Sequence, residues 1–113
     1  MNPTDRYRQI RAQAGQWLAE LPERPDCRIE TRHARDADGG LFDIIDIETQ
    51  SHVCRININT PIFAPYRHIC IEALAVDDDT GGYYWHDGGR DPQEDEIRKR
   101  LQELAARIFP TGK

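Results

Sequence analysis

Short polar connections join the strand-like runs between residues 27 and 86, and they constrain the fold more than any other feature of the sequence. DADGG at 36–40, Gln50-Ser51 and DDDTGG at 77–82 are typical of turns, and NTPIFAP at 59–65 is a loop with two prolines. A crossover between parallel strands needs about a dozen residues or more, usually including a helix. The middle of the chain is therefore predicted to form an antiparallel meander.

Apolar and polar residues alternate along these runs with the period of a β-strand. The predicted strands span residues 27–34, 41–49, 51–58, 66–77 and 83–86. Alternation breaks at Ile44-Ile45, which indicates either a bulge or a strand that is apolar on both faces. The run at 66–77 is long and rich in apolar residues, so we expect it at the centre of the sheet.

Two segments with a helical period flank the strands. Apolar residues recur at offsets of three, four and seven in residues 4–21, where Thr4 or Asp5 is expected to cap the helix. In the second segment Asp91 is the expected N-cap, Pro92 the first helical residue and Glu94 the partner in a capping box. The sequence thus predicts one α+β domain over residues 1–113. In this two-layer fold an antiparallel meander of four to five strands carries both helices on one face, and the other face is left to solvent or to a partner.

A chain of 113 residues with 38% hydrophobic and 31% charged residues is typical of one soluble globular domain. The start MNPTDRYRQI lacks the apolar segment of a secretory signal, and no apolar run is long enough to span a bilayer. We therefore expect a cytoplasmic protein without a membrane partner. Cys27, Cys54 and Cys70 lie in strand-like runs without zinc-type spacing, so they are expected to be reduced, buried thiols, and no metal or cofactor is predicted.

The net charge of −5 is unevenly distributed along the chain. Residues 36–96 contain fourteen acidic and three basic residues, whereas residues 1–35 carry a charge of +2 and residues 97–113 a charge of +4. An acidic middle segment repels phosphate backbones, which argues against a nucleic-acid partner. The same segment attracts a basic protein surface, and a solvated face without a partner is the alternative.

The polar residues form no recognisable catalytic or metal-binding motif. His86 and Asp87 are neighbours at the end of a predicted strand, so their side chains are expected to point to opposite faces. The run that begins at Asp77 lacks the glutamate that a calcium loop carries at its twelfth position. The other histidines are scattered over separate runs, and no phosphate-binding or nucleophile motif is present. We expect no enzymatic activity, and an enzyme that uses His86 or the acidic residues is the less favoured alternative.

A docking surface is the favoured interpretation of GGYYWHDGGRD at 81–91 and of the acids around it. Trp85 is expected in the core with Tyr83 on the same face, whereas alternation places Tyr84 on the opposite face. An exposed tyrosine among carboxylates is typical of a protein-binding patch. The predicted partner-binding residues are Asp43, Asp46, Glu48, Asp77, Asp78, Asp79, Tyr83, Tyr84 and Asp87.

The layout of the chain resembles that of the small immunity proteins of bacterial polymorphic toxins, in particular the TriTu group. The resemblance is carried by the helix with Trp17, the strands around IIDIET and CRINI, and EALAVDDDTGGYYW followed by a helix. It implies that the chain binds a cognate toxin domain, such as an ADP-ribosyltransferase or another effector with a basic cleft, and occludes its active site. The family has no catalytic residues to carry over, so the contact residues named above follow from the charge distribution alone.

A type III secretion chaperone that holds an unfolded effector segment is the alternative binding function. Such chaperones are also small, acidic α+β proteins, and they are dimers with a helix between the third and fourth strands. The two prolines of residues 59–65 argue against a helix at that place.

Overall fold

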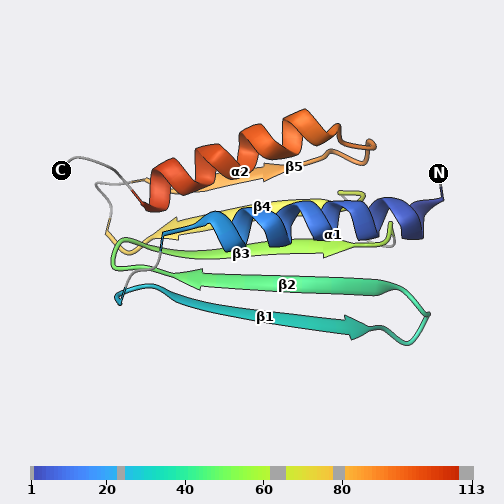
Figure 1. Cartoon of the computed structure of the whole chain (residues 1–113), viewed down its shortest axis with the longest axis horizontal. Coiled ribbons are helices and arrows are strands. Elements are labelled where there is room, and N and C mark those ends of the chain that lie inside the picture. The colour runs from blue at the N-terminus through green and yellow to red at the C-terminus, as the bar shows by residue number, and fades with distance from the viewer. Residues whose placement is uncertain (1, 23–24, 62–65, 78–80, 110–113) are drawn as a thin grey trace.

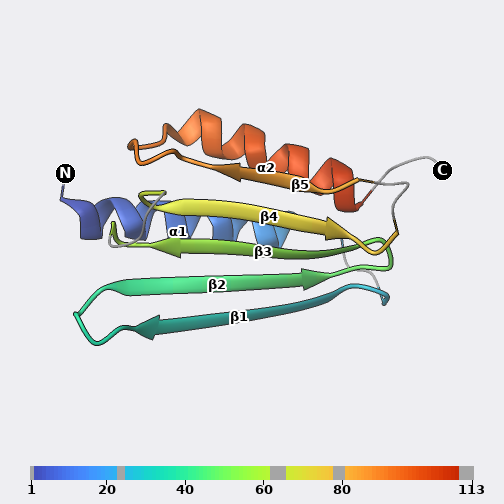
Figure 2. The ribbon, with the colours of Figure 1, turned by 180° about the vertical axis from the view of Figure 1, so that it is seen from behind.

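The computed structural model describes residues 2–22, 25–61, 66–77 and 81–109 of the chain. The elements are α1 (Pro3–Glu20), β1 (Arg28–Arg35), β2 (Leu41–Glu48), β3 (His52–Asn59), β4 (Ile69–Ala75), β5 (Tyr83–His86) and α2 (Glu94–Ile108). The strands form one antiparallel sheet in the order β1-β2-β3-β4-β5, and both helices lie on the same side of it (Figure 1, Figure 2). The predicted α+β fold is confirmed, with five strands in the meander.

The core lies between the sheet and the two helices. Because directly paired residues of neighbouring strands point to the same face, the register follows one apolar side of the sheet from β2 to β5. We call this side the helix face. Its buried side chains are Ile45, Ile47, Cys54, Ile56, Ile58, Ile69, Ile71 and Ala73. The helices contribute Tyr7, Ile10, Ala14, Ile97, Leu101, Leu104 and Ile108.

The first helix begins earlier than the apolar period indicated. The side chain of Asn2 accepts a hydrogen bond of 2.8 Å from the backbone N–H of Asp5, so Asn2 is the N-cap. Pro3 then occupies the first turn, where its missing N–H costs nothing because that turn has no intrahelical acceptor for it.

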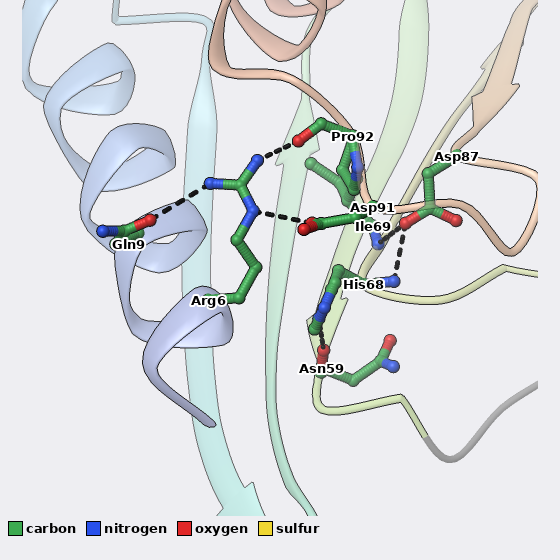
Figure 3. A network of polar contacts seen from close by, with 8 residues as sticks. All are labelled: Arg6, Gln9, Asn59, His68, Ile69, Asp87, Asp91 and Pro92. Atoms are coloured by element: carbon green, nitrogen blue, oxygen red, sulfur yellow. Dashed lines mark hydrogen bonds and ion pairs between the residues drawn. The ribbon is translucent and has the colours of Figure 1, made fainter. Parts of the chain in front are cut away.

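The second helix begins later than predicted. It starts at Glu94 after Gln93, which provides no side-chain cap, so the predicted cap at Asp91 and start at Pro92 are wrong. The carboxylate of Asp91 and the carbonyl of Pro92 instead accept hydrogen bonds from the guanidinium of Arg6 in α1 (Figure 3). A tertiary contact between α1 and the loop before α2 therefore replaces the local capping interaction.

β2 is apolar on both faces and contains no bulge. Its register with β1 and β3 runs without interruption through Ile44 and Ile45. Ile45 is buried on the helix face, whereas Ile44 is half-buried on the opposite face. Of the two explanations for the broken alternation, the strand with two apolar faces is correct.

Two glycines are required by the backbone. Gly39 in the turn between β1 and β2 has a φ of 86°, a conformation that other L-residues rarely adopt. Gly82 stands directly before β5, and a Cβ at this position would lie 2.6 Å from the carbonyl oxygen of Ala73. A larger residue at position 82 would therefore force β5 away from β4.

Candidate binding surface

The side of the sheet that faces away from both helices is not covered by either of them (Figure 2). We call this side the open face. The register places alternate residues of every strand on it, in rows that cross the sheet. The open face consists of Arg28, Glu30, Arg32, Ala34, Phe42, Ile44, Asp46, Glu48, Val53, Arg55, Asn57, Asn59, Cys70, Glu72, Leu74, Tyr84 and His86.

Three large apolar side chains are strongly exposed at one end of the open face. The exposed fractions are 49% for Val53, 71% for Leu74 and 60% for Tyr84. Val53 and Leu74 are directly paired, and Tyr84 is the diagonal neighbour of Leu74 on β5. We call these residues the apolar strip. Neighbouring exposed apolar side chains are typical of a surface that docks on another protein.

The open face carries charges of both signs and does not form an acidic patch. Asp46 accepts hydrogen bonds of 2.7 and 3.1 Å from its cross-strand partner Arg55, and Arg32 lies 3.7 Å away. The Glu48 carboxylate likewise lies 3.7 Å from the guanidinium of its cross-strand partner Arg28. The four carboxylates and three guanidinium groups of this face leave one excess negative charge. Folding has therefore dispersed the acidic segment and paired Asp46 and Glu48 with arginines.

Asp43 lies on the helix face and not beside Asp46 and Glu48. Its carboxylate accepts hydrogen bonds from the hydroxyl of Tyr7, from Nε of Arg11 at 2.5 Å and from Nδ1 of His33 at 2.6 Å. Burial by itself raises the pKa of Asp43, but these hydrogen bonds outweigh burial and lower the pKa below its usual value. The Asp43 carboxylate thus joins α1 to the β1–β2 hairpin.

Replacing Asp43 by asparagine is expected to make the free energy of unfolding depend less steeply on pH at acidic pH. Because the pKa of Asp43 is lowered on folding, its contribution is fully present above the unfolded pKa of about 3.9. The contribution is lost as the pH falls through the lower, folded pKa. Urea unfolding from about pH 6 down to about pH 3 should show a steeper loss of unfolding free energy in the native protein than in Asp43→Asn. Tyr7→Phe removes one of the hydrogen bonds and should fall between the two; equal slopes for all three proteins would contradict this assignment.

Tyr83 also belongs to the interior. It lies on the helix face, where its hydroxyl donates a hydrogen bond of 2.7 Å to Glu103 of α2, and burial is the main cause that raises its pKa to about 12. Trp85, the next residue on this face, packs against the core beneath the guanidinium of Arg100. The predicted division, with Tyr83 and Trp85 on one face and Tyr84 on the other, is confirmed.

Asp87 is buried directly after β5, with 1% of its surface exposed. Its carboxylate accepts backbone hydrogen bonds from His68 at 2.6 Å and from Ile69 at 3.1 Å (Figure 3). It also accepts backbone hydrogen bonds from Arg67 at 2.6 Å and from Gly89 at 3.2 Å. The backbone N–H groups of residues 67 and 68 thus donate to the Asp87 side chain and not to a neighbouring strand. β4 begins at Ile69, so the predicted start at residue 66 is wrong. The predicted contact of Asp87 with a partner is incompatible with this burial.

Of the predicted contact residues, the structure brings Asp46, Glu48 and Tyr84 together on the open face. Asp77 is exposed directly after β4, and Asp78 and Asp79 lie outside the described residues. Among the open-face residues that the sequence did not single out are Val53, Leu74, Arg55 and Glu72. Alternation placed Val53 and Arg55 on one side of their strand, but it did not show which side of the sheet is the one without helices.

A histidine and a carboxylate meet at a place that the sequence analysis missed. His33 and Asp43 are directly paired across β1 and β2, and the Asp43 carboxylate holds Nδ1 of His33. Such a carboxylate orients an imidazole and leaves Nε2 for proton transfer. The DADGG turn could have indicated this pair, because a hairpin centred on that turn pairs position 33 with position 43. His86, in contrast, accepts a hydrogen bond of 2.9 Å from the N–H of Gly88, while the carboxylate of its neighbour Asp87 accepts from backbone amides.

A groove of about 550 Å³ lies between the helices and is lined in part by Arg6, Gln13, Trp17, Glu94 and Arg98. No histidine among the described residues lines it, so it does not join a histidine to an acid as the enzyme alternative requires. Within the described ranges, no three His, Cys, Asp or Glu side chains are grouped as a metal site requires. The connection between β3 and β4 is not helical at residues 60–61 and 66–68.

The fold and the surface together define a two-layer α+β protein with one sheet face left open. Comparison of the chain with protein-family models, with curated proteins and with solved structures finds no match. Neither helix in the described part of the chain is long and apolar enough to cross a bilayer.

Proposed function

We propose that this chain is an immunity protein that binds a cognate bacterial toxin domain and occludes its active site, with the open face as its docking surface. The observation that supports this proposal most directly is the apolar strip, which lies on a sheet face that neither helix covers. Burying apolar surface against a partner is favourable by about 25 cal/mol per Å² before the costs of association. Neutralisation of this kind requires no chemistry from the chain itself.

Tyr84 is the strongest anchor on the open face. Its ring stands edge-on to the ring of His86, with the ring centres 5.5 Å apart. Contacts with neighbours on the same face hold the ring in place, so little side-chain freedom is lost on binding. Tyrosine in such a setting is enriched among the residues that dominate binding energies.

The charges around the apolar strip supply specificity. Glu72 lies between Arg55 and Tyr84 in one cross-strand row, and Glu48 lies beside Val53 in the next. A partner must match this arrangement of charges, since like charges brought face to face disfavour binding. The basic cleft of a toxin that holds phosphates would meet Glu72, Glu48 and the excess negative charge of the face. The proposed set of partner-contact residues therefore differs from the one predicted from sequence. It no longer includes Asp43, Tyr83 and Asp87. It now includes Val53, Leu74 and Glu72.

Truncation of Tyr84 to alanine is expected to weaken toxin binding by about 2 kcal/mol, roughly thirtyfold. The proposal predicts that a toxin domain is encoded beside the gene for this chain. The test uses that domain, with calorimetry for affinity and growth of toxin-expressing cells for protection. Leu74→Asp should abolish protection, because it places a carboxylate in the apolar strip. Lys99→Ala, on the exposed side of α2, is the matched control and should bind like the native chain.

Two outcomes would overturn the proposal at different levels. If the native chain neither binds nor neutralises the neighbouring toxin domain, the immunity function is rejected. If the native chain protects and Tyr84→Ala combined with Leu74→Asp protects equally well, the open face is not the docking surface, although the function stands.

A further inference from the structure

β1 is the longer of the two edge strands of the sheet. It is eight residues long and, among the described residues, pairs only with β2, whereas the other edge strand, β5, has four residues. All residues of β1 except Ala34 are exposed. Such an edge presents a row of free backbone donors and acceptors, and it is a template for another strand.

The charges of β1 are incompletely matched within the chain. Glu30 faces Asp46 across the β1–β2 pair, and like charges in this position are destabilising. Asp46 is already paired with Arg55 and lies close to Arg32. Among the described residues, Glu30 has no ion-pair partner. A cation supplied at the outer edge of β1 would compensate this carboxylate.

We propose that a second copy of the chain supplies that cation, by antiparallel pairing of β1 with β1 about a two-fold axis at Thr31. In this register Glu30 of each copy faces Arg32 of the other copy, so two opposite-charge pairs form across the new interface. Thr31 faces Thr31, which is also a favourable cross-strand pair. The two sheets become one continuous sheet of ten strands.

Charge selects this register over its neighbours. Centring the pairing on Glu30 places Glu30 opposite Glu30, and centring it on Arg32 places Arg32 opposite Arg32. Centring it on His33 leaves Arg32 opposite Ala34 and Thr31 opposite Arg35, without any attractive pair. Centring it on Ile29 keeps the charges matched but pairs only residues 28–30 of the strand. The register at Thr31 is the one that combines length with charge complementarity.

The helix side of β1 contributes apolar surface to the same interface. Ile29 is 42% exposed beside a hollow lined by Leu18, Leu21 and Cys27. In the proposed register His33 of the second copy lies opposite Ile29 and covers part of it. Because the two-fold axis is perpendicular to the sheet, the open faces of both copies lie on one side. The proposal rests on β1 alone and does not depend on the function proposed for the open face.

Sedimentation equilibrium of the purified full chain tests the pairing. The native chain is expected to form a dimer of twice 13.1 kDa in a concentration-dependent manner. Glu30→Arg and Arg32→Glu should each raise the dimer dissociation constant by about tenfold or more, because each creates two like-charge contacts. The exchange of both residues, Glu30→Arg with Arg32→Glu, should restore the dimer, since the opposite charges again meet.

Folding of the variants is followed separately by urea unfolding. Glu30→Arg places a guanidinium opposite Asp46 within the chain, so the isolated protomer should be at least as stable as the native one. A native chain that stays monomeric up to millimolar concentration overturns the proposal. A dimer that survives both single substitutions, or that the double exchange fails to restore, overturns it as well.

Discussion

Asp87→Ala is expected to lower the free energy of unfolding by about 3–5 kcal/mol, because it leaves buried backbone donors without an acceptor. The N–H groups of Arg67, His68, Ile69 and Gly89 all point to the Asp87 carboxylate, which is 1% exposed. Each buried donor that loses its partner costs about 1–3 kcal/mol, and water entering the vacated space would recover part of this. The loss should also loosen the start of β4, the strand between β3 and β5.

Urea unfolding of the purified variant measures this effect. Asp91→Ala is the matched control, since Asp91 lies in the same loop but is 62% exposed and contacts the guanidinium of Arg6 at the surface. Its loss is expected to cost less than about 1 kcal/mol. If Asp87→Ala were no less stable than Asp91→Ala, the carboxylate would not be the acceptor on which this part of the sheet depends.

Ile71→Ala is expected to cost about 2–5 kcal/mol, because it creates a cavity in the centre of the core. Ile71 is fully buried on the helix face of β4 and is paired with Ile56 on one side and Trp85 on the other. Neighbours on both strands restrict the collapse of the space that the substitution leaves, which favours the upper part of this range.

Leu74→Ala, on the opposite face of the same strand, separates stability from binding. Leu74 is 71% exposed, so its truncation should change the free energy of unfolding by no more than about 0.5 kcal/mol. The order of the two variants should be reversed for toxin affinity. Leu74→Ala should bind the toxin domain more weakly than the native chain, whereas the fraction of Ile71→Ala that is folded should keep its affinity. Equal destabilisation by both would mean that the open face is packed against something in solution.

The residues that share a face of each strand were predictable, because side chains alternate between the two faces and this alternation can be read from neighbouring residues in the sequence. The division of Tyr83, Tyr84 and Trp85 between faces followed from it, whereas the break at Ile44-Ile45 left open whether β2 contains a bulge or is apolar on both faces. The start of the second helix was not predictable from capping patterns, because Arg6 occupies both Asp91 and the carbonyl of Pro92. The selection of Asp43 and Asp87 as contact residues relied on charge alone, and charge does not reveal which carboxylates are used inside the fold.

The sequence by itself determined the order of the elements, the antiparallel meander and the two faces of each strand, since turns and periodicities depend on residues close together in the chain. Only the tertiary structure decided which face stays open and which acids remain at the surface. The reason is that helix packing and cross-strand pairing bring together residues far apart in sequence. Asp43 meets Tyr7, Arg11 and His33, and Asp87 meets four backbone amides, so both are held inside. Asp46 meets arginines on the open face and stays within reach of a partner.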